Sequence, residues 1–190
     1  PSAPLSAPLP STETAPTPAP AATMTPPPAM SFPEIVVVPA TGGMQVVGLA
    51  RNDSSLPLRD VSLAIDLLDD DGESLGTLSA ALLLSSVQPG ALSPFRAAVP
   101  EGLSPASTRV SLQGFRPGTR VPINVTLESA SMAASPDGPR LLGLVRNEGT
   151  QTLQVRELAV VWRDGGGLLA GAELAAIPQA PLPPDGSLPW

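Results

Sequence analysis

Apolar and polar side chains alternate along most of this chain from Phe32 onward, and a period of two predicts β-strands. The clearest run follows Arg59, where the apolar positions are Val61, Leu63, Ile65 and Leu67 and the residues between them are polar or small. Shorter apolar or alternating runs occur at 35–38, 44–51, 95–99, 108–112 and 123–127. We therefore predict an all-β chain of short antiparallel strands.

Turn-forming residues separate these runs. The segments 52–55, 69–72 and 89–90 are built from Asn, Asp, Ser, Pro and Gly, the residue types that favour tight turns. Asp71-Gly72 between two strand-like runs is typical of a β-hairpin. Short strands separated by such turns predict an antiparallel β-sandwich of the immunoglobulin-like kind.

One stretch of the sequence occurs twice, 95 residues apart. A gap-free comparison of 48–95 with 143–190 gives 14 identities over 48 positions. Unrelated chains of ordinary composition would share roughly 3 or 4. The repeated signature pairs Gly48, Arg51, Asn52, Asp69 and Gly72 with Gly143, Arg146, Asn147, Asp164 and Gly167. A period of this length indicates whole domains in tandem rather than a solenoid of short repeats.

The repeat predicts three parts of the chain. Residues 1–31 form a linker or stalk rich in Pro, Ala, Ser and Thr, which lacks the apolar periodicity needed for a packed core. Residues 32–118 form the first β-sandwich, and 119–190 form a second, shortened one, because Trp190 falls on the position of Phe95. The second sandwich lacks the later strands of the first, so we expect an open strand edge in it.

Composition and charge exclude several functions. The formal net charge is -7, and the ten basic residues are single, scattered arginines, so no basic stripe exists for a nucleic-acid backbone. The sequence has no cysteine and no histidine. Disulfides, thiol nucleophiles and histidine-based catalysis or metal binding are thereby ruled out. No apolar run reaches the roughly 18 residues of a membrane span.

One acidic turn is a weak candidate for Ca²⁺. Asp69, Asp70, Asp71 and Glu73 offer carboxylate oxygens, the ligands that Ca²⁺ prefers. The second copy keeps only Asp164 of this set, so a solvated turn is the preferred interpretation. We assign no catalytic residue and no cofactor.

Two further pairs of residues have structural explanations that we prefer to ligand binding. Trp162 and Trp190 align with Leu67 and Phe95, which predicts core positions rather than sugar-stacking platforms. Arg51 and Arg146, each followed by Asn, are expected to brace the turn after their strand. Asn52 and Asn124 each start a glycosylation sequon, a short pattern with frequent chance matches.

The first repeat resembles the FxLYD-type domain. The resemblance rests on the glycine-containing strand 48–52, on Ile65-Asp66-Leu67-Leu68-Asp69, and on Pro89-Gly90 followed by Phe95; Val160 to Asp164 (VVWRD) stands in the motif of the second copy. Ile replaces the Phe of the motif and Leu replaces its Tyr. The resemblance implies immunoglobulin-like domains of prokaryotic cell-surface proteins or lipoproteins, usually without assigned catalysis.

These observations together predict a non-enzymatic structural or protein-interaction module outside the cytoplasm. The chain starts at Pro1 without an initiator methionine, so we expect a processed product or a fragment whose anchor lies elsewhere. The open edge of the second domain is expected to bind a protein partner or a continuation of the chain. Homo-oligomeric or polymeric assembly is left open, and a carbohydrate-binding or adhesive module is the alternative.

Overall fold

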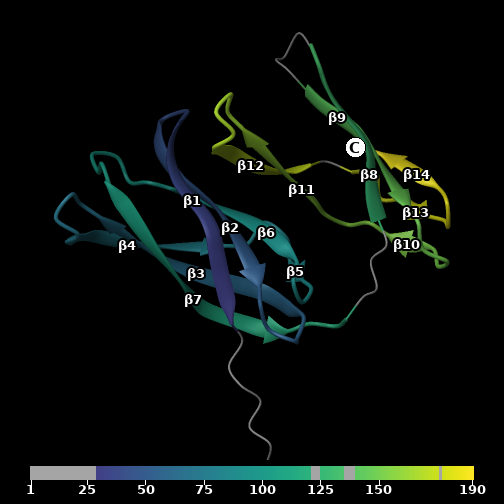
Figure 1. Cartoon of the computed structure of the whole chain (residues 1–190), viewed down its shortest axis with the longest axis horizontal. Helices are drawn as coiled ribbons and strands as arrows, with labels where there is room; N and C mark the ends of the chain where they lie inside the picture. Colours follow the sequence, from purple (N-terminus) through teal and green to yellow (C-terminus); the bar gives the residue numbers. More distant parts are fainter. Residues whose placement is uncertain (1–28, 121–124, 135–139, 176) are drawn as a thin grey trace, which may run out of the picture.

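The computed structural model of the protein describes residues 29–120, 125–134, 140–175 and 177–190, and all regular structure in these ranges is β-strand (Figure 1). The strands of the first half are β1 Met30–Ala40, β2 Gly43–Asn52, β3 Leu58–Leu68, β4 Ser74–Ala81, β5 Ser86–Val87, β6 Leu92–Ala98 and β7 Ser107–Pro117. Those of the second half are β8 Val125–Ala133, β9 Arg140–Asn147, β10 Leu153–Gln154, β11 Leu158–Arg163, β12 Leu169–Ala175, β13 Pro181–Leu182 and β14 Ser187–Pro189. Every strand pairing is antiparallel, so the predicted all-β class is confirmed.

Two sheets make up the first half. One has the order β1-β2-β6, and in the other β3 pairs with β4, β5 and β7. The alternating positions predicted for β3 all lie in one core, together with Val46 of β2 and Phe95 of β6. Burying the apolar face of each sheet against the other is what stabilises this arrangement. Residues 1–28, most of the predicted stalk, lie outside the described residues.

The 95-residue repeat is reproduced in the strand pairing. Met30 faces Asn52 across β1 and β2, and Val125 faces Asn147 across β8 and β9. Gly48 pairs with Phe95. In the second half the Gly143 and Trp190 backbones exchange hydrogen bonds of 3.1 and 3.0 Å. The two halves therefore use the same register.

The turns repeat as well. The backbone N–H groups of Gly72 and Gly167 donate to the carbonyls of Asp69 and Asp164, at 3.1 and 3.0 Å. Both glycines have a positive φ, 80° and 84°, a conformation that disfavours a side chain. These glycines are conserved between the halves because each closes the same hairpin.

The second half departs from the first in how its sheets pack. Its strands form the three-stranded sheet β14-β9-β8 and two separate pairs, β11-β12 and β10-β13. Among the described residues no strand pairs with β11 as β7 pairs with β3. The β11–β12 hairpin instead lies on the first half, where Leu169 and Ala172 of β12 pack on Val47 and Leu49 of β2 (Figure 1).

The division into two separate sandwiches stays a prediction, because this hairpin shares a buried cluster with the first half. A second cluster, formed by Val145, Leu182 and Leu188, holds the remaining strands of the second half together. Within the described ranges, the chain has no helix with the length and hydropathy that a membrane crossing requires.

Candidate functional site

The repeated Asn52 is a buried structural residue. It ends β2 with no exposed surface. Its Nδ2 group donates to the carbonyls of Leu56 at 2.8 Å and Val87 at 3.0 Å, and its Oδ1 accepts from the backbone N–H and the hydroxyl of Ser54. A buried amide with all these partners ties the end of β2 to the following turn and to β5.

Asn147 makes the same contacts in the second half. Its Nδ2 donates to the carbonyls of Gln151 at 2.8 Å and Leu182 at 3.0 Å, and its Oδ1 accepts from the Gly149 N–H at 2.9 Å. The sequence placed these asparagines in turns but gave no sign of their burial. In the folded chain the Asn52 amide of the first sequon is buried and hydrogen-bonded, so it is closed to modification in this state. Asn124 of the second sequon lies outside the described residues.

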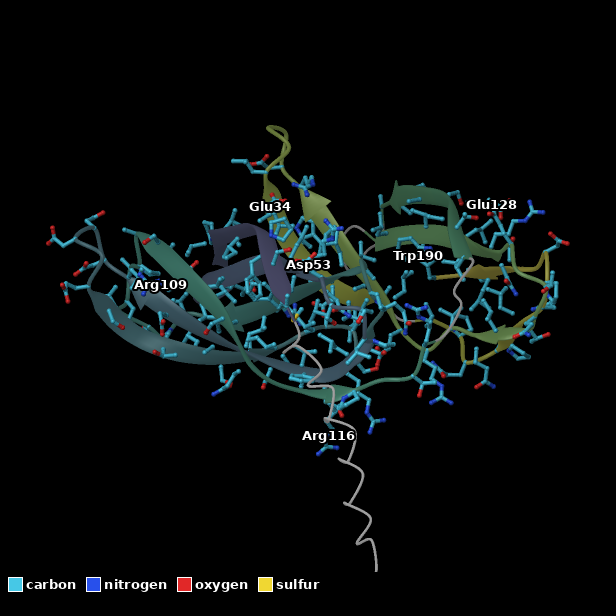
Figure 2. The ribbon with its side chains drawn as sticks, turned by 60° about the horizontal axis from the view of Figure 1, so that its bottom comes forward. Glu34, Asp53, Arg109, Arg116, Glu128 and Trp190 are labelled. Carbon is cyan, nitrogen blue, oxygen red and sulfur yellow. The ribbon has the colours of Figure 1, made fainter. Side chains whose placement is uncertain are left out.

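Gly48 and Gly143 are required by close approach of an aromatic ring. A Cβ at Gly48 would overlap the ring of Phe95, and a Cβ at Gly143 would overlap the indole of Trp190. Phe95 is fully buried and meets Phe32 edge-to-face, with ring centroids 6.2 Å apart. The predicted equivalence of Trp190 and Phe95 is thus matched by an equivalent glycine, and Figure 2 shows Trp190 beside the strands of the second half.

The repeated arginines pair with carboxylates of neighbouring turns. Arg51 lies 3.2 Å from Asp53, in the turn that follows β2, as the prediction of a braced turn requires. Arg146 lies 3.5 Å from Asp185, in the turn before β14. Both pairs are exposed, so each contributes little to stability.

The acidic turn is built by one of its carboxylates. Asp69 Oδ1 accepts from the N–H groups of Asp71 and Glu73 at 3.0 and 2.8 Å, and Asp164 Oδ1 accepts two equivalent bonds in the second half. Among the described residues, no three acidic side chains are gathered as metal ligands. The contacts of Asp69 therefore explain this residue as the cap of a turn.

Two bidentate ion pairs hold the β11–β12 hairpin on the first half. Arg163 donates to both oxygens of Glu34, at 2.8 and 2.7 Å, and the Leu169 N–H donates to the same carboxylate at 2.9 Å. Arg96 donates to both oxygens of Glu173 in the same fashion. Figure 2 shows Glu34 beside the β11–β12 hairpin. These pairs flank the apolar contact of β12 with β2.

Acidification is expected to loosen this attachment. The hydrogen bonds from Arg163, followed by that from the Leu169 N–H, lower the pKa of Glu34 below its ordinary value of 4.5. Because the pKa of Glu34 is lower in the folded state, its ionised carboxylate stabilises the attachment. This stabilisation is complete above about pH 4.5 and is lost as the pH falls through the lowered pKa. The Leu169 amide shift, followed by NMR, should report that transition.

Glu34→Gln is the control for this titration, because it keeps the side-chain shape and removes the ionisable group. The Leu169 shift should then be flat over the same pH range. An unchanged transition in Glu34→Gln would assign the titration to another group.

One edge of β11 lacks a partner strand among the described residues. In the first half the Asp69 N–H donates toward β4, whereas the Leu68 carbonyl accepts from Ala106, at the start of β7. Backbone groups alternate sides along a strand, so every second residue of β3 points to β7. By the same alternation the backbone groups of Ala159, Val161 and Arg163 point away from β12. We call this side of β11 the free edge.

The expectation that Trp162 is a core residue was wrong. Its counterpart Leu67 is fully buried, but Trp162 is 45% exposed and its ring lies over Gly171 on the neighbouring strand. Two other residues at core-equivalent positions, Leu127 and Leu141, are 59% and 38% exposed. Trp162 is exposed because the hairpin lies on the first half and, within the described ranges, no strand corresponding to β7 lies beside β11.

A cavity of about 550 Å³ opens between β1 and the start of β7. Its lining includes Phe32, Ile35, Met44, Pro105 and Thr108, and none of its lining side chains is titratable. The cavity therefore has a mixed lining of apolar and hydroxyl side chains and offers no acid or base.

Comparisons with protein-family models, with curated proteins and with solved structures gave no match.

Proposed function

We propose that this chain is a non-enzymatic structural and protein-interaction module of the cell envelope, which holds a protein partner at the free edge of β11. The proposal has its support in one observation: β11 repeats β3, but among the described residues it has a partner on one side only. An extended segment added there would gain main-chain hydrogen bonds along the strand. The location outside the cytoplasm follows from the resemblance to FxLYD-type domains and from the Pro-rich segment.

The exposed apolar side chains of β11 favour the same function. Val161 and Trp162 are 38% and 45% exposed, and an exposed apolar strand edge is a template for pairing with another chain. Of the three positions that face away from β12, Ala159 and Val161 are small or apolar and only Arg163 carries the kind of charge that protects an edge from pairing. The edge therefore has the features of a surface that binds a strand.

Amide hydrogen exchange tests the free edge directly. The amides of Ala159, Val161 and Arg163 should exchange at least about 100-fold faster than those of Ala64, Asp66 and Leu68, which face β7. The measurement is made at a concentration where sedimentation gives a monomer. Equal protection of the two sets of amides in the monomer would contradict the proposed function.

Carbohydrate binding is the second candidate, because Trp162 is 45% exposed. A flat, exposed indole is suited to stacking on a sugar ring. A glycan array probed with the native chain and with Trp162→Ala should then show binding that is lost in the variant. Val161→Thr serves as the matched control, since it changes the neighbouring residue and keeps the indole. Binding that survives in Trp162→Ala would exclude this candidate.

A further inference from the structure

We infer that the free edge of β11 accepts an antiparallel segment of a protein partner in the register that β7 adopts on β3, with apolar residues at alternate positions and an uncharged residue opposite Val161. This inference rests on the proposed function and specifies the partner's chemistry. The partner segment is called the donor strand below. Its length is set by β11, which has six residues.

The register follows from the repeat. On β3, Leu63, Ile65 and Leu67 face Leu112, Val110 and Thr108 of β7. Shifted by 95 residues, the receiving positions are Leu158, Val160 and Trp162. Val110 and Leu112 are half-buried against the core of the first half. The corresponding residues of the donor strand would lie next to Val160 and Leu158, and a third would cover the exposed indole of Trp162.

The opposite face of the strand distinguishes the donor strand from β7. In the first half Asp66 faces Arg109, which Figure 2 shows on β7. In the second half Val161 occupies the position of Asp66. An arginine of the donor strand opposite Val161 would have no carboxylate to pair with and would face an apolar side chain. Side chains that face each other across two strands contribute to the pairing, so a β-branched apolar residue should be preferred at this position.

The composition of the donor strand also excludes proline-rich sequence. A strand that pairs along the free edge must donate its own N–H groups, and proline has none. Residues 1–28 contain ten prolines and have no proline-free run longer than five residues, so this segment is a poor donor. The donor is therefore a proline-free, alternating segment of another protein.

Labelled synthetic peptides test the inference. The probe is STRVSLQGFRP, residues 107–117 of this chain, in three forms: native, Arg109→Val, and Val110→Asp. Fluorescence polarisation against the full chain should show tighter binding of the Arg109→Val peptide than of the native one, by about threefold. The Val110→Asp peptide should bind at least about 10-fold more weakly than the native one, because it buries a charge.

Two variants of the full chain locate the binding site. Val161→Pro removes an N–H that points to the free edge and leaves the ladder to β12 intact, so peptide binding should be lost. Val161→Thr keeps the N–H and should still bind. Bound peptide should also slow amide exchange at Ala159, Val161 and Arg163. Peptide binding that persists unchanged in Val161→Pro would overturn the inference.

The remaining outcomes separate the inference from the proposed function. If the amides of the free edge exchange fast but the three peptides bind equally, the inferred register is wrong and the proposed function still stands. Protection of the same amides in the monomeric chain without peptide would contradict both. Protection that appears only with self-association would identify a second copy of this chain as the occupant and overturn the inference.

Discussion

Replacing Asn52 with alanine is expected to lower the free energy of unfolding by about 3 kcal/mol. The substitution removes the amide that donates to the carbonyls of Leu56 and Val87 at 2.8 and 3.0 Å, and the bond to Val87 is buried. The Leu56 carbonyl keeps the Ser54 hydroxyl, 3.0 Å away. An unsatisfied buried group costs about 1–3 kcal/mol, and the expected loss also includes the two bonds from Ser54 to the Asn52 Oδ1. Urea unfolding followed by far-UV circular dichroism measures the loss.

The environment of Asn52 offers matched controls. Ser54→Ala removes the hydroxyl that bonds to the Asn52 Oδ1 and to the exposed backbone of Leu56, leaves the buried Asn52 amide in place, and should cost about 1 kcal/mol. Asn147→Ala should cost less than Asn52→Ala. Among the described residues, the Oδ1 of Asn147 accepts one hydrogen bond, whereas the Oδ1 of Asn52 accepts two. Both tryptophans lie in the second half, so tryptophan fluorescence follows the unfolding of that half only. Amide exchange is used to follow the unfolding of the first half. If Asn52→Ala behaves like Ser54→Ala, the buried amide is not what fastens the end of β2.

Replacing Gly48 with alanine is expected to destabilise the first half by about 3 kcal/mol, the upper end of the usual overpacking range. The added Cβ would overlap the Phe95 ring and lie 3.1 Å from the Glu34 carbonyl oxygen. Phe95 is fully buried in the core and contacts Phe32, so its ring has little room to move aside. Thermal unfolding of the variant, followed by circular dichroism, measures the effect.

A double-mutant cycle with Phe95→Leu tests the cause. Removing the ring should relieve the clash, so Gly48→Ala should cost about 1–2 kcal/mol less in the Phe95→Leu background than alone. Gly165→Ala is the surface control, because a Cβ there meets no atom within 4 Å. Additive effects of Gly48→Ala and Phe95→Leu would show that the ring is not the reason for the glycine.

The strands and turns of this protein could be predicted because their signals are local. Alternation around Leu63 and Ile65 predicted β3, and Gly72 predicted the hairpin that follows it. The repeat also gave the register of the second half, since two segments with the same turns and apolar positions pair in the same way. Each of these signals lies within a few residues of the feature that it determines.

The position of the β11–β12 hairpin could have been suspected from a comparison of the two repeats. Asp66, Ser74 and Thr77 of the first half are replaced by Val161, Leu169 and Ala172 in the second. These residues lie on the outer face of the hairpin, so the substitutions convert a polar outer face into an apolar one. The signal indicated that this face is covered, but it did not say which surface covers it.

The sequence by itself determined the positions of the strands, the turns and the correspondence of the two halves, because these depend on periodicity and on residues with special backbone freedom. Only the tertiary structure decided that Asn52 is buried, that Trp162 is exposed, and that Arg163 binds Glu34 across 129 positions of sequence. Burial and ion pairing depend on which distant segments meet. That outcome is a balance of packing and charge over the whole chain, and no single stretch of sequence contains it.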